Sequence, residues 1–383
     1  MIRRRDGLQT LLRIRQASPP GRSVAYAATP FVPEITPSLE NEIRSPLMRR
    51  MALSEKARRH ARLVAVTLVM VLGWYPAGTA AQGEPTAGVS PSSGLLLIVS
   101  MDESRVDLID EATLRTVASL NTGKSPHEVR VAPDGRTAYV VSGPTITAID
   151  LSSRTVRRTF DLGEFAAHDV RISRDGRRLW AACAPRQTVL EVDTRTGAVL
   201  NRFRTSRDGA WFVEVNPEET TLYTPNLEGT SVSVITRATG EVKVLPLEHR
   251  AYGIDVTPDG KQVLVSGRGV AVIDTSRDVI SGTIATTPAD TGRIRITPDG
   301  RRVVVAMEKS IAVFEIAGGR LIRETPLPAS PKVLALSGDG RRAYLSNPED
   351  HSATIVDLEQ GRVVTTVKTG RRPDGIAWAP KAG

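Results

Sequence analysis

The sequence of 383 residues contains very little cysteine, because Cys183 is the only one. A single cysteine excludes a disulfide within the chain and a thiolate metal cluster. The chain tolerates an oxidising compartment, but its stability must come from packing. Cys183 itself lies in a strand-like apolar segment, where we expect a buried thiol rather than a nucleophile.

Short catalytic and nucleotide-binding signatures are also missing. The sequence contains no nucleotide-binding loop and no HExxH, CxxCH or GxSxG motif, so enzyme classes that a single segment identifies find no support. The tripeptide Gly267-Arg268-Gly269 resembles only part of a phosphate loop, because it joins two strand-like segments and does not open a helix. Any site must therefore be assembled from separate parts of the chain.

One uninterrupted apolar run, residues 63–74, is too short for a comfortable membrane span. Basic residues precede this run, and the small residues 77–81 follow it. That order is typical of a secretory signal peptide. We expect cleavage after Ala80 or Ala81 and a periplasmic or secreted product with no stable membrane anchor.

The expected domain organisation follows from this leader. Residues 48–81 are predicted to be the signal peptide, residues 82–93 a linker and residues 94–383 the folded part. Residues 1–47 are rich in proline and show no periodic pattern. We interpret them as an unstructured extension or as sequence ahead of the true start.

The formal net charge of +9 is concentrated in the leader. Residues 1–81 hold 13 of the 51 Lys and Arg residues and 5 of the 42 Asp and Glu residues, which leaves 38 basic and 37 acidic residues in the remainder. A nearly neutral mature chain gives no support to polyanion binding. We therefore expect no nucleic-acid partner.

The strongest pattern in the sequence is a turn that recurs at successive spacings of 41, 43, 41, 40, 40 and 42 residues. A nearly constant period in this range indicates a repeat architecture. Three copies read Pro-Asp-Gly and two more keep Asp-Gly; in the full motif proline presets φ, aspartate bonds back to the backbone and glycine takes positive φ. The seven copies begin at Pro133, Arg174, Pro217, Pro258, Pro298, Gly338 and, degenerately, Pro380.

Each period contains four short apolar runs rich in Val, Ile, Leu and Tyr, with no stretch at helical spacing. This pattern predicts an antiparallel four-stranded sheet. Such a sheet is apolar on both faces and cannot bury them alone, so the units must stack, and stacking around a ring leaves only short edges. The sequence therefore predicts an all-β fold, a seven-bladed β-propeller.

The two ends of the repeat region point to how the ring closes. The first unit, residues 95–121, has only three strand-like runs, whereas residues 375–379 form one run without partners in its own unit. We therefore expect the C-terminal strand to complete the first blade.

Two tetrapeptides make the resemblance to a known family specific. Tyr223-Thr224-Pro225-Asn226 and Tyr344-Leu345-Ser346-Asn347 each follow a turn and precede a strand-like run with a Val-Ile or Ile-Val pair. Over residues 94–380 the chain resembles the YVTN family of β-propeller repeats, which occur in exported prokaryotic proteins. The corresponding segments at residues 139–142, 180–183 and 304–307 depart from the motif. Since the motif is structural, these departures bear on neither the fold nor an activity.

Aligning the units shows which positions should converge at one end of the central channel. Histidine-carboxylate pairs start the innermost strands of two neighbouring blades, and aromatic residues start the next two. The predicted ligand-binding residues are His127, Glu128, His168, Asp169, Trp211, Phe212, Tyr252, Arg293, Lys332 and Asp374.

Two readings of this set remain open. Imidazoles beside carboxylates can bind a divalent metal or act as an acid and base pair, and the aromatic rings suit a flat or apolar ligand. Alternatively, His127 and His168 are one exposed repeat position duplicated in adjacent units and linked to nearby arginines. The metal and the cofactor, if any, stay unidentified.

Further along the innermost strands, charged residues recur at positions that should face the channel. Because a closed ring offers few routes to water, we expect these side chains to pair with one another in ion networks. The residues are Arg130, Arg171, Glu214, Asp255 and Arg295.

Three functions are compatible with these features. The favoured one is a non-catalytic binding or scaffold protein of the cell envelope that holds a partner protein or a small ligand. The first alternative is a metal-dependent hydrolase similar to lactonase propellers, with Glu128, Asp169 or Asn226 around the metal. The second is a redox accessory protein that holds haem or a quinone noncovalently through His127 or His168.

Export gives the first testable prediction. We expect the mature protein to begin at Ala81 or Gln82, which N-terminal sequencing and intact-mass measurement of the exported chain would establish. Tryptic peptides from residues 1–47 in the precursor would show that translation starts ahead of Met48.

Overall fold

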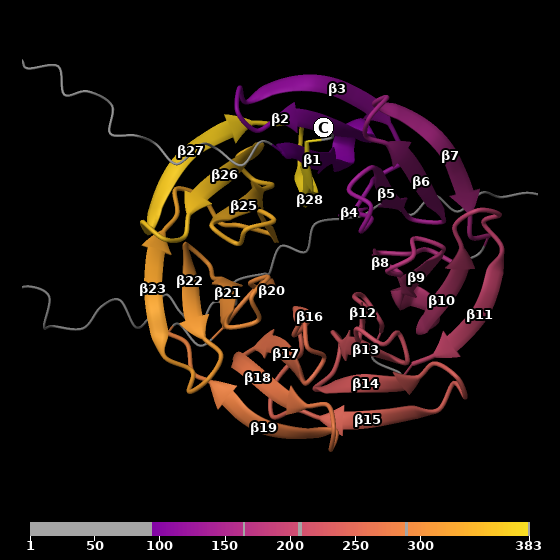
Figure 1. The fold of residues 1–383 in the computed structure, drawn as a ribbon, viewed down its shortest axis with the longest axis vertical. Coiled ribbons are helices and arrows are strands. Elements are labelled where there is room, and N and C mark those ends of the chain that lie inside the picture. Colours follow the sequence, from indigo (N-terminus) through magenta and orange to yellow (C-terminus); the bar gives the residue numbers. More distant parts are fainter. Residues whose placement is uncertain (1–93, 164, 206–208, 288–289, 382–383) are drawn as a thin grey trace, which may run out of the picture. The chain divides into compact units, whose positions relative to one another are not determined.

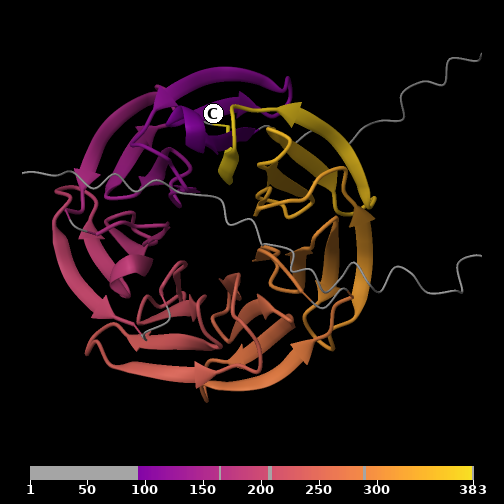
Figure 2. The same ribbon diagram turned by 180° about the vertical axis from the view of Figure 1, so that it is seen from behind.

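The computed structural model describes residues 94–163, 165–205, 209–287 and 290–381. These residues form seven four-stranded antiparallel sheets arranged around a central channel (Figures 1 and 2). The seven-bladed all-β fold predicted from the repeat is therefore confirmed. The predicted extension, signal peptide and linker lie outside the described residues.

Blades are numbered from the N-terminus, and each contributes one strand to every radial layer. The innermost strands, in blade order, are β28 (Pro373–Pro380), β4 (Glu128–Val131), β8 (Asp169–Ile172), β12 (Glu214–Val215), β16 (Ile254–Val256), β20 (Ile294–Ile296) and β24 (Val333–Leu336). The second layer holds β1 (Gly94–Ser100), β5 (Thr137–Ser142), β9 (Arg178–Cys183), β13 (Thr221–Asn226), β17 (Gln262–Gly267), β21 (Arg302–Ala306) and β25 (Arg342–Asn347).

The third and outermost layers complete the blades. The third layer holds β2 (Arg105–Asp110), β6 (Thr145–Asp150), β10 (Thr188–Asp193), β14 (Ser231–Thr236), β18 (Gly269–Asp274), β22 (Ser310–Glu315) and β26 (Ser352–Asp357). The outer layer holds β3 (Arg115–Asn121), β7 (Thr155–Asp161), β11 (Val199–Arg204), β15 (Val242–Pro246), β19 (Val279–Ile284), β23 (Leu321–Pro326) and β27 (Arg362–Lys368).

Helical structure in the described residues is limited to two 3₁₀ turns, η3 (Met101–Glu103) and η4 (Ala184–Arg186). No helix in this part of the chain is long and apolar enough to cross a membrane.

The recurring Pro-Asp-Gly turn joins the first and second strands of a blade. In blade 2, Asp134 Oδ1 accepts hydrogen bonds from the backbone N–H groups of Arg136 at 2.8 Å and Thr137 at 2.9 Å. Gly135 has φ of 65°, a conformation that glycine adopts without steric cost. In blade 4 the turn reads differently, and Asn216 Oδ1 accepts from the N–H of Thr220 instead. The turn geometry therefore tolerates sequence departures at this position.

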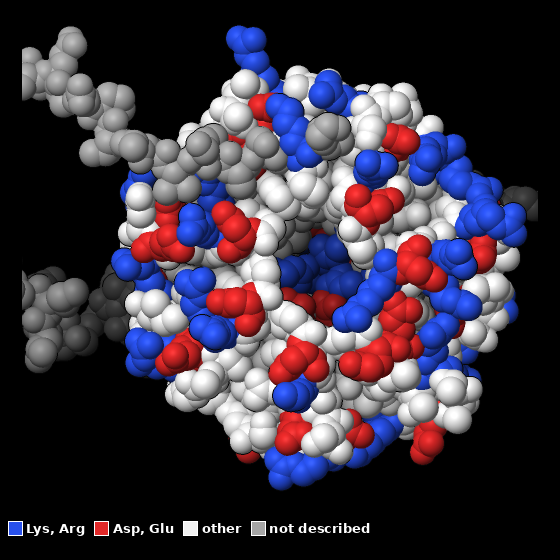
Figure 3. All heavy atoms as spheres, in the orientation of Figure 1, with Lys and Arg blue, Asp and Glu red and all other residues white. Residues whose placement is uncertain are grey.

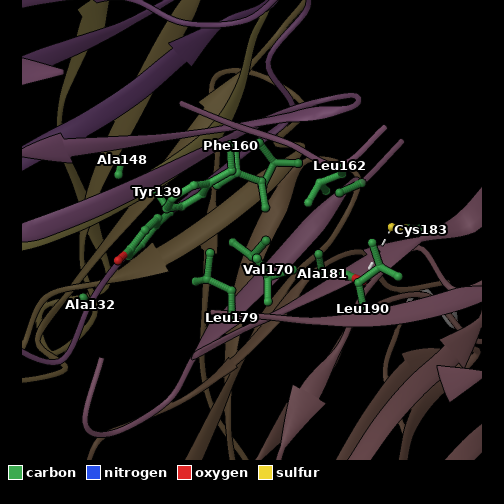
Figure 4. Close-up of a cluster of buried hydrophobic side chains, with 14 residues drawn as sticks. Ala132, Tyr139, Ala148, Phe160, Leu162, Val170, Leu179, Ala181, Cys183 and Leu190 are labelled. Atoms are coloured by element: carbon green, nitrogen blue, oxygen red, sulfur yellow. Dashed lines mark hydrogen bonds between the residues drawn. The ribbon is translucent and has the colours of Figure 1, made fainter. Parts of the chain in front are cut away.

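The hydrophobic core is divided among the seven contacts between neighbouring blades, and each contact holds its own cluster of buried side chains. Figure 4 shows the cluster between blades 2 and 3, in which Tyr139 and Phe160 face Val170 and Leu179. Cys183 belongs to the same cluster and is fully buried, and burial raises the pKa of its thiol to about 12. The predicted burial of this cysteine is confirmed.

The C-terminal strand β28 closes the ring. It pairs with β1, so that Leu95 lies opposite Ala379 and Leu97 opposite Ala377, as predicted from the incomplete first unit. On its channel side, the N–H of Gly375 donates to the carbonyl of His127 in blade 2 at 2.7 Å. A Cβ at Gly375 would lie 2.7 Å from that carbonyl oxygen, so only glycine allows this approach.

Removal of the closing strand provides the second prediction. Deleting residues 372–383 exposes the edge of β1 and removes the buried side chain of Ile376, so we expect the midpoint of thermal unfolding to fall by more than about 10 °C. Deleting only residues 381–383 is the matched control and should change the midpoint little. An equal, small shift for both variants would show that β28 does not close the ring. Circular dichroism during heating measures both.

Candidate functional site

The ten residues predicted for the channel mouth lie on or next to the innermost strands and form one connected set of contacts. Ion pairs, hydrogen bonds and ring contacts run from Lys332 in blade 7 through blades 1, 2, 3 and 4 to Tyr252 in blade 5. Arg293 in blade 6 joins this set through Glu128 and Phe212. That the set binds a ligand stays a prediction.

A carboxylate on the closing strand anchors one side of the mouth. Asp374 Oδ2 lies 3.0 Å from Lys332 Nζ and 3.2 Å from His127 Nδ1. Its side chain is almost fully buried. Burial alone would raise the pKa of Asp374, but the hydrogen bond to His127 and the charge of Lys332 outweigh it and lower the pKa. Asp374 therefore holds two cationic or polar side chains at the mouth.

The two histidines stack on each other at the mouth. The ring centroids of His127 and His168 are 4.8 Å apart with an angle of 25° between the planes, and Trp211 meets His168 edge-on at 4.9 Å. Burial, followed by the proximity of His127, lowers the pKa of His168 to about 4. At neutral pH His168 is therefore an uncharged imidazole.

Two buried nitrogen atoms in this group have no hydrogen-bond partner among the described residues: His168 Nδ1 and Trp211 Nε1. Buried polar atoms are nearly always paired with protein or water, so each such atom calls for an explanation. The rings of His168 and Trp211 meet edge-on, and His168 also stacks on His127. These two nitrogens are the polar ring atoms at the mouth whose hydrogen bonds the described residues do not supply.

Beneath the histidines, an ion pair spans the channel. Arg293 of blade 6 pairs with Glu128 of blade 2, and its guanidinium carbon lies 3.6 Å from the centroid of the Phe212 ring. The exposed fraction is 3% for Arg293 and 0% for Glu128. Burial, with the nearby charge of Arg295, lowers the pKa of Arg293 to about 9. The stacked position on Phe212 gives the guanidinium a cation–π contact in addition to its ion pair.

The charged positions further along the channel form the ion network that the sequence predicts, with a difference at two residues. Arg130 lies 3.0 Å from Asp169 and 3.3 Å from Glu128, and Arg171 is bound by Glu214. Asp255 instead accepts a hydrogen bond from the N–H of Ile296 at 2.8 Å, and Arg295 donates to the carbonyl of Ile294 at 3.0 Å. The network is confirmed for Arg130, Arg171 and Glu214 only.

These contacts determine what the two carboxylates beside the histidines can do. Glu128 pairs with Arg293 and Arg130, and Asp169 pairs with Arg130 and Arg171. Among the described residues, no group of three or more His, Cys, Asp or Glu side chains is placed to hold a metal ion. The donor set therefore does not fit the expected metal site around Glu128, Asp169 or Asn226, and Asn226 bonds to Ser231 and Ser233 instead.

A smaller cavity of about 220 Å³ adjoins the mouth at Tyr252. His249, Arg250, Asp290 and Thr291 line it and were not among the predicted site residues. These residues come from loops that vary between units, so no repeat signal identifies them.

The fold and the mouth define the class of protein, a repeat propeller. The ion pair between Arg293 and Glu128 crosses its channel, and histidine and aromatic side chains border the mouth. The chain belongs to the YNCE-like beta-propeller family, whose model matches residues 58–382. The resemblance to YVTN repeats is consistent with this membership. A search of curated proteins finds no match.

Solved structures show the same fold at low sequence identity. A protein of unknown function from Desulfotomaculum acetoxidans is 17% identical with a TM-score of 0.67, covering 75% of this chain and 99% of that one. Kuenenia stuttgartiensis hydrazine synthase is 18% identical with a TM-score of 0.59, covering 67% and 90%. The dihydro-heme d1 dehydrogenase NirN in complex with DHE is 15% identical with a TM-score of 0.56, covering 79% of each chain. These likenesses establish the fold alone.

The state of His168 generates the third prediction. Its pKa is about 4 in the folded protein against 6.5 for the ordinary side chain, so between these values the unfolded chain binds more protons and stability falls as pH is lowered. The difference corresponds to about 3 kcal/mol of unfolding free energy between pH 7.5 and pH 4. We expect H168N to remove most of this dependence. Urea denaturation at pH 7.5, 6 and 4.5 measures it.

The control is H351N, which replaces an exposed histidine on the loop after β25. This variant should keep the pH dependence of the parent protein. If H168N retained the full dependence, His168 would not be the buried neutral group that the geometry describes.

Proposed function

We propose that this chain is an exported, non-catalytic binding protein, periplasmic or secreted, whose channel mouth holds a small flat ligand. The observation that carries the proposal concerns two buried ring nitrogens, His168 Nδ1 and Trp211 Nε1, that have no hydrogen-bond partner among the described residues. The two rings meet edge-on, and His127 stacks on His168. A concave, largely preformed mouth with a few polar groups among aromatic rings is the usual form of a small-molecule site.

The chemistry of the mouth narrows the kind of ligand. Trp211 Nε1 is a donor only, so the ligand must present an acceptor to it. Uncharged His168 can accept or donate at Nδ1, depending on its tautomer. The aromatic faces of Tyr252 and the imidazoles favour a planar group that stacks or meets them edge-on. A ring with carbonyl or ring-nitrogen acceptors satisfies these conditions.

We propose a non-catalytic role because the ionisable side chains at the mouth are engaged in ion pairs and hydrogen bonds with one another. The carboxylates of Glu128 and Asp169 are each held by two guanidinium groups, so they are poor proton acceptors at neutral pH. His127 is oriented by Asp374, but its contacts within the described residues are with that carboxylate and with His168. Asp374 is also paired with Lys332, so its carboxylate is engaged by two side chains.

A noncovalently held quinone or haem is the second candidate function. Stacked imidazoles next to Trp211 and Phe212 favour a flat conjugated ring system. NirN, which shares the fold, is described in complex with DHE. In such a complex the bound group would supply redox chemistry, while His127, His168 and Trp211 would bind and orient it.

The fourth prediction concerns ligand binding at the mouth. Protein purified from the producing cells should carry a small molecule detectable by native mass spectrometry, with an absorption band if the ligand is a quinone or haem. With the emptied protein, menadione and protoporphyrin IX serve as probes, followed by quenching of tryptophan fluorescence. We expect at least one probe to bind and H168A to weaken it about tenfold or more.

H351A is the matched control, because it removes an exposed imidazole whose side-chain hydrogen bond within the described residues is with the backbone N–H of Arg372 and not with His127, His168 or Trp211. A co-purifying protein whose retention depends on Trp211 would favour a partner protein as the occupant of the mouth. If no small molecule or protein co-purifies and neither probe binds, the mouth is a structural cluster and the proposal is wrong.

A further inference from the structure

The other end of the channel contains a cavity that the proposed function does not use. Its volume is about 320 Å³, and its wall carries three guanidinium groups and two carboxylates. Figure 3 shows one face of the disc with a central hollow in which basic and acidic side chains meet. The charged residues of the cavity are Arg130, Arg171, Arg295, Glu214 and Asp255.

The carboxylates in this wall are committed to other partners. Glu214 binds Arg171, with Oε2 2.6 Å from Arg171 Nε. Asp255 accepts from two backbone N–H groups, those of Val256 at 3.1 Å and Ile296 at 2.8 Å. Neither carboxylate forms an ion pair with Arg295 among the described residues. In the part of the chain that the structure describes, Arg295 is therefore left without a direct carboxylate partner, whereas Arg130 and Arg171 have theirs.

Arg295 is the least satisfied of the three arginines. Within the described part of the chain, its one hydrogen bond is donated by Nη1 to the carbonyl of Ile294 at 3.0 Å. Arg130, by contrast, forms ion pairs with Glu128 through Nη1 and with Asp169 through Nη2, and only its buried Nε lacks both an ion-pair and a hydrogen-bond partner among these residues. The guanidinium of Arg295 is therefore the one with N–H groups left to pair beside the cavity.

The electrostatics agree with this geometry. Burial, and then the charge of Arg130, lowers the pKa of Arg295 to about 10, and burial lowers the pKa of Arg130 as well. A buried cation without a matching anion is costly, and an added anion would relieve that cost.

We propose that this cavity binds a small organic acid, whose carboxylate pairs with Arg295 and Arg130. The planar fork of a guanidinium matches a carboxylate in a bidentate pair, which a point charge does not reproduce. The two guanidiniums belong to β20 and β4, on opposite sides of the channel, so the anion lies between blades 6 and 2.

The remaining wall suits a short carbon chain. Ala335, Leu336 and Ala377 contribute apolar surface, and the indole of Trp378 lines the cavity while its Nε1 donates to Glu111 at 2.9 Å. The indole of Trp378 and these apolar side chains can contact the carbon chain of a small acid whose carboxylate pairs with the guanidinium groups. Glu214 and Asp255 would repel a second negative charge nearby, so a monocarboxylate fits better than a dicarboxylate.

Isothermal titration at pH 7.5 and constant ionic strength tests this site, with acetate, lactate, succinate and inorganic phosphate as probes. We expect acetate and lactate to bind in the millimolar range or tighter, succinate to bind more weakly, and R295Q to weaken the monocarboxylates about tenfold or more. R295K keeps the charge but loses the fork, so its affinity should lie between those of the parent protein and R295Q.

R320Q is the matched control, because Arg320 is an exposed arginine paired with Glu315 on a surface turn; its affinity should equal that of the parent. Lactate should also raise the thermal midpoint of the parent and not of R295Q. If R295Q fails to fold, the same comparison with R295K decides. Undetectable binding of both monocarboxylates, equal affinity in R295Q or R295K, or tighter binding of phosphate than of lactate would overturn the proposal.

This proposal is independent of the one for the mouth. Arg295 has no contact with the histidines or with Trp211 among the described interactions. Failure of menadione or protoporphyrin binding therefore leaves the organic-acid test unaffected, and the reverse also holds.

Discussion

The pairing between the first and last strands of the propeller is the constraint on which the rest of the molecule depends. Each blade is apolar on both faces and is stable only between two neighbours. The β1–β28 pairing supplies that second neighbour to blades 2 and 7 at once. It also delivers Asp374 to the mouth, where this residue holds His127 and Lys332. The same strand pairing therefore closes the ring and places Asp374 in the candidate site.

Buried ion pairs dominate the channel, although they are a poor source of stability in general. Removing Arg293 and Glu128 from water costs much of what their attraction returns. These ion pairs instead fix the positions of side chains. The innermost strands bring their side chains close together around the channel, where apolar residues would have no specific partner. The guanidinium of Arg293 fixes both Glu128 and the ring of Phe212. The orientation of the mouth depends on this fixation.

The fold was predictable because its determinants are local and repeated. The turn at Asp134 depends on three neighbouring residues, and its copies set the number of blades. The convergence of the ten mouth residues followed from aligning those copies. Their individual partners did not follow, since His127 and Asp374 are 247 residues apart and Arg293 and Glu128 are 165 apart. Whether a long side chain crosses the channel or bonds to its own strand depends on geometry that periodicity does not encode.

Arg295 and Asp255 illustrate the same limit. Both face the channel, as their position in the repeat predicts. Each forms hydrogen bonds with backbone groups, and the two side chains do not form an ion pair with each other. This departure from simple pairing leaves the guanidinium of Arg295 without a direct carboxylate partner among the described residues. It could be found only from the contacts of each atom.

The ion pair between Arg293 and Glu128 has a consequence for both ends of the channel. Asp169, Glu128 and Phe212 are buried around it. Glu128 pairs with Arg293 on the side of the mouth and with Arg130, which lines the arginine cavity. One carboxylate thus belongs to both ends of the channel, so a change in charge at one end alters the electrostatic environment of the other.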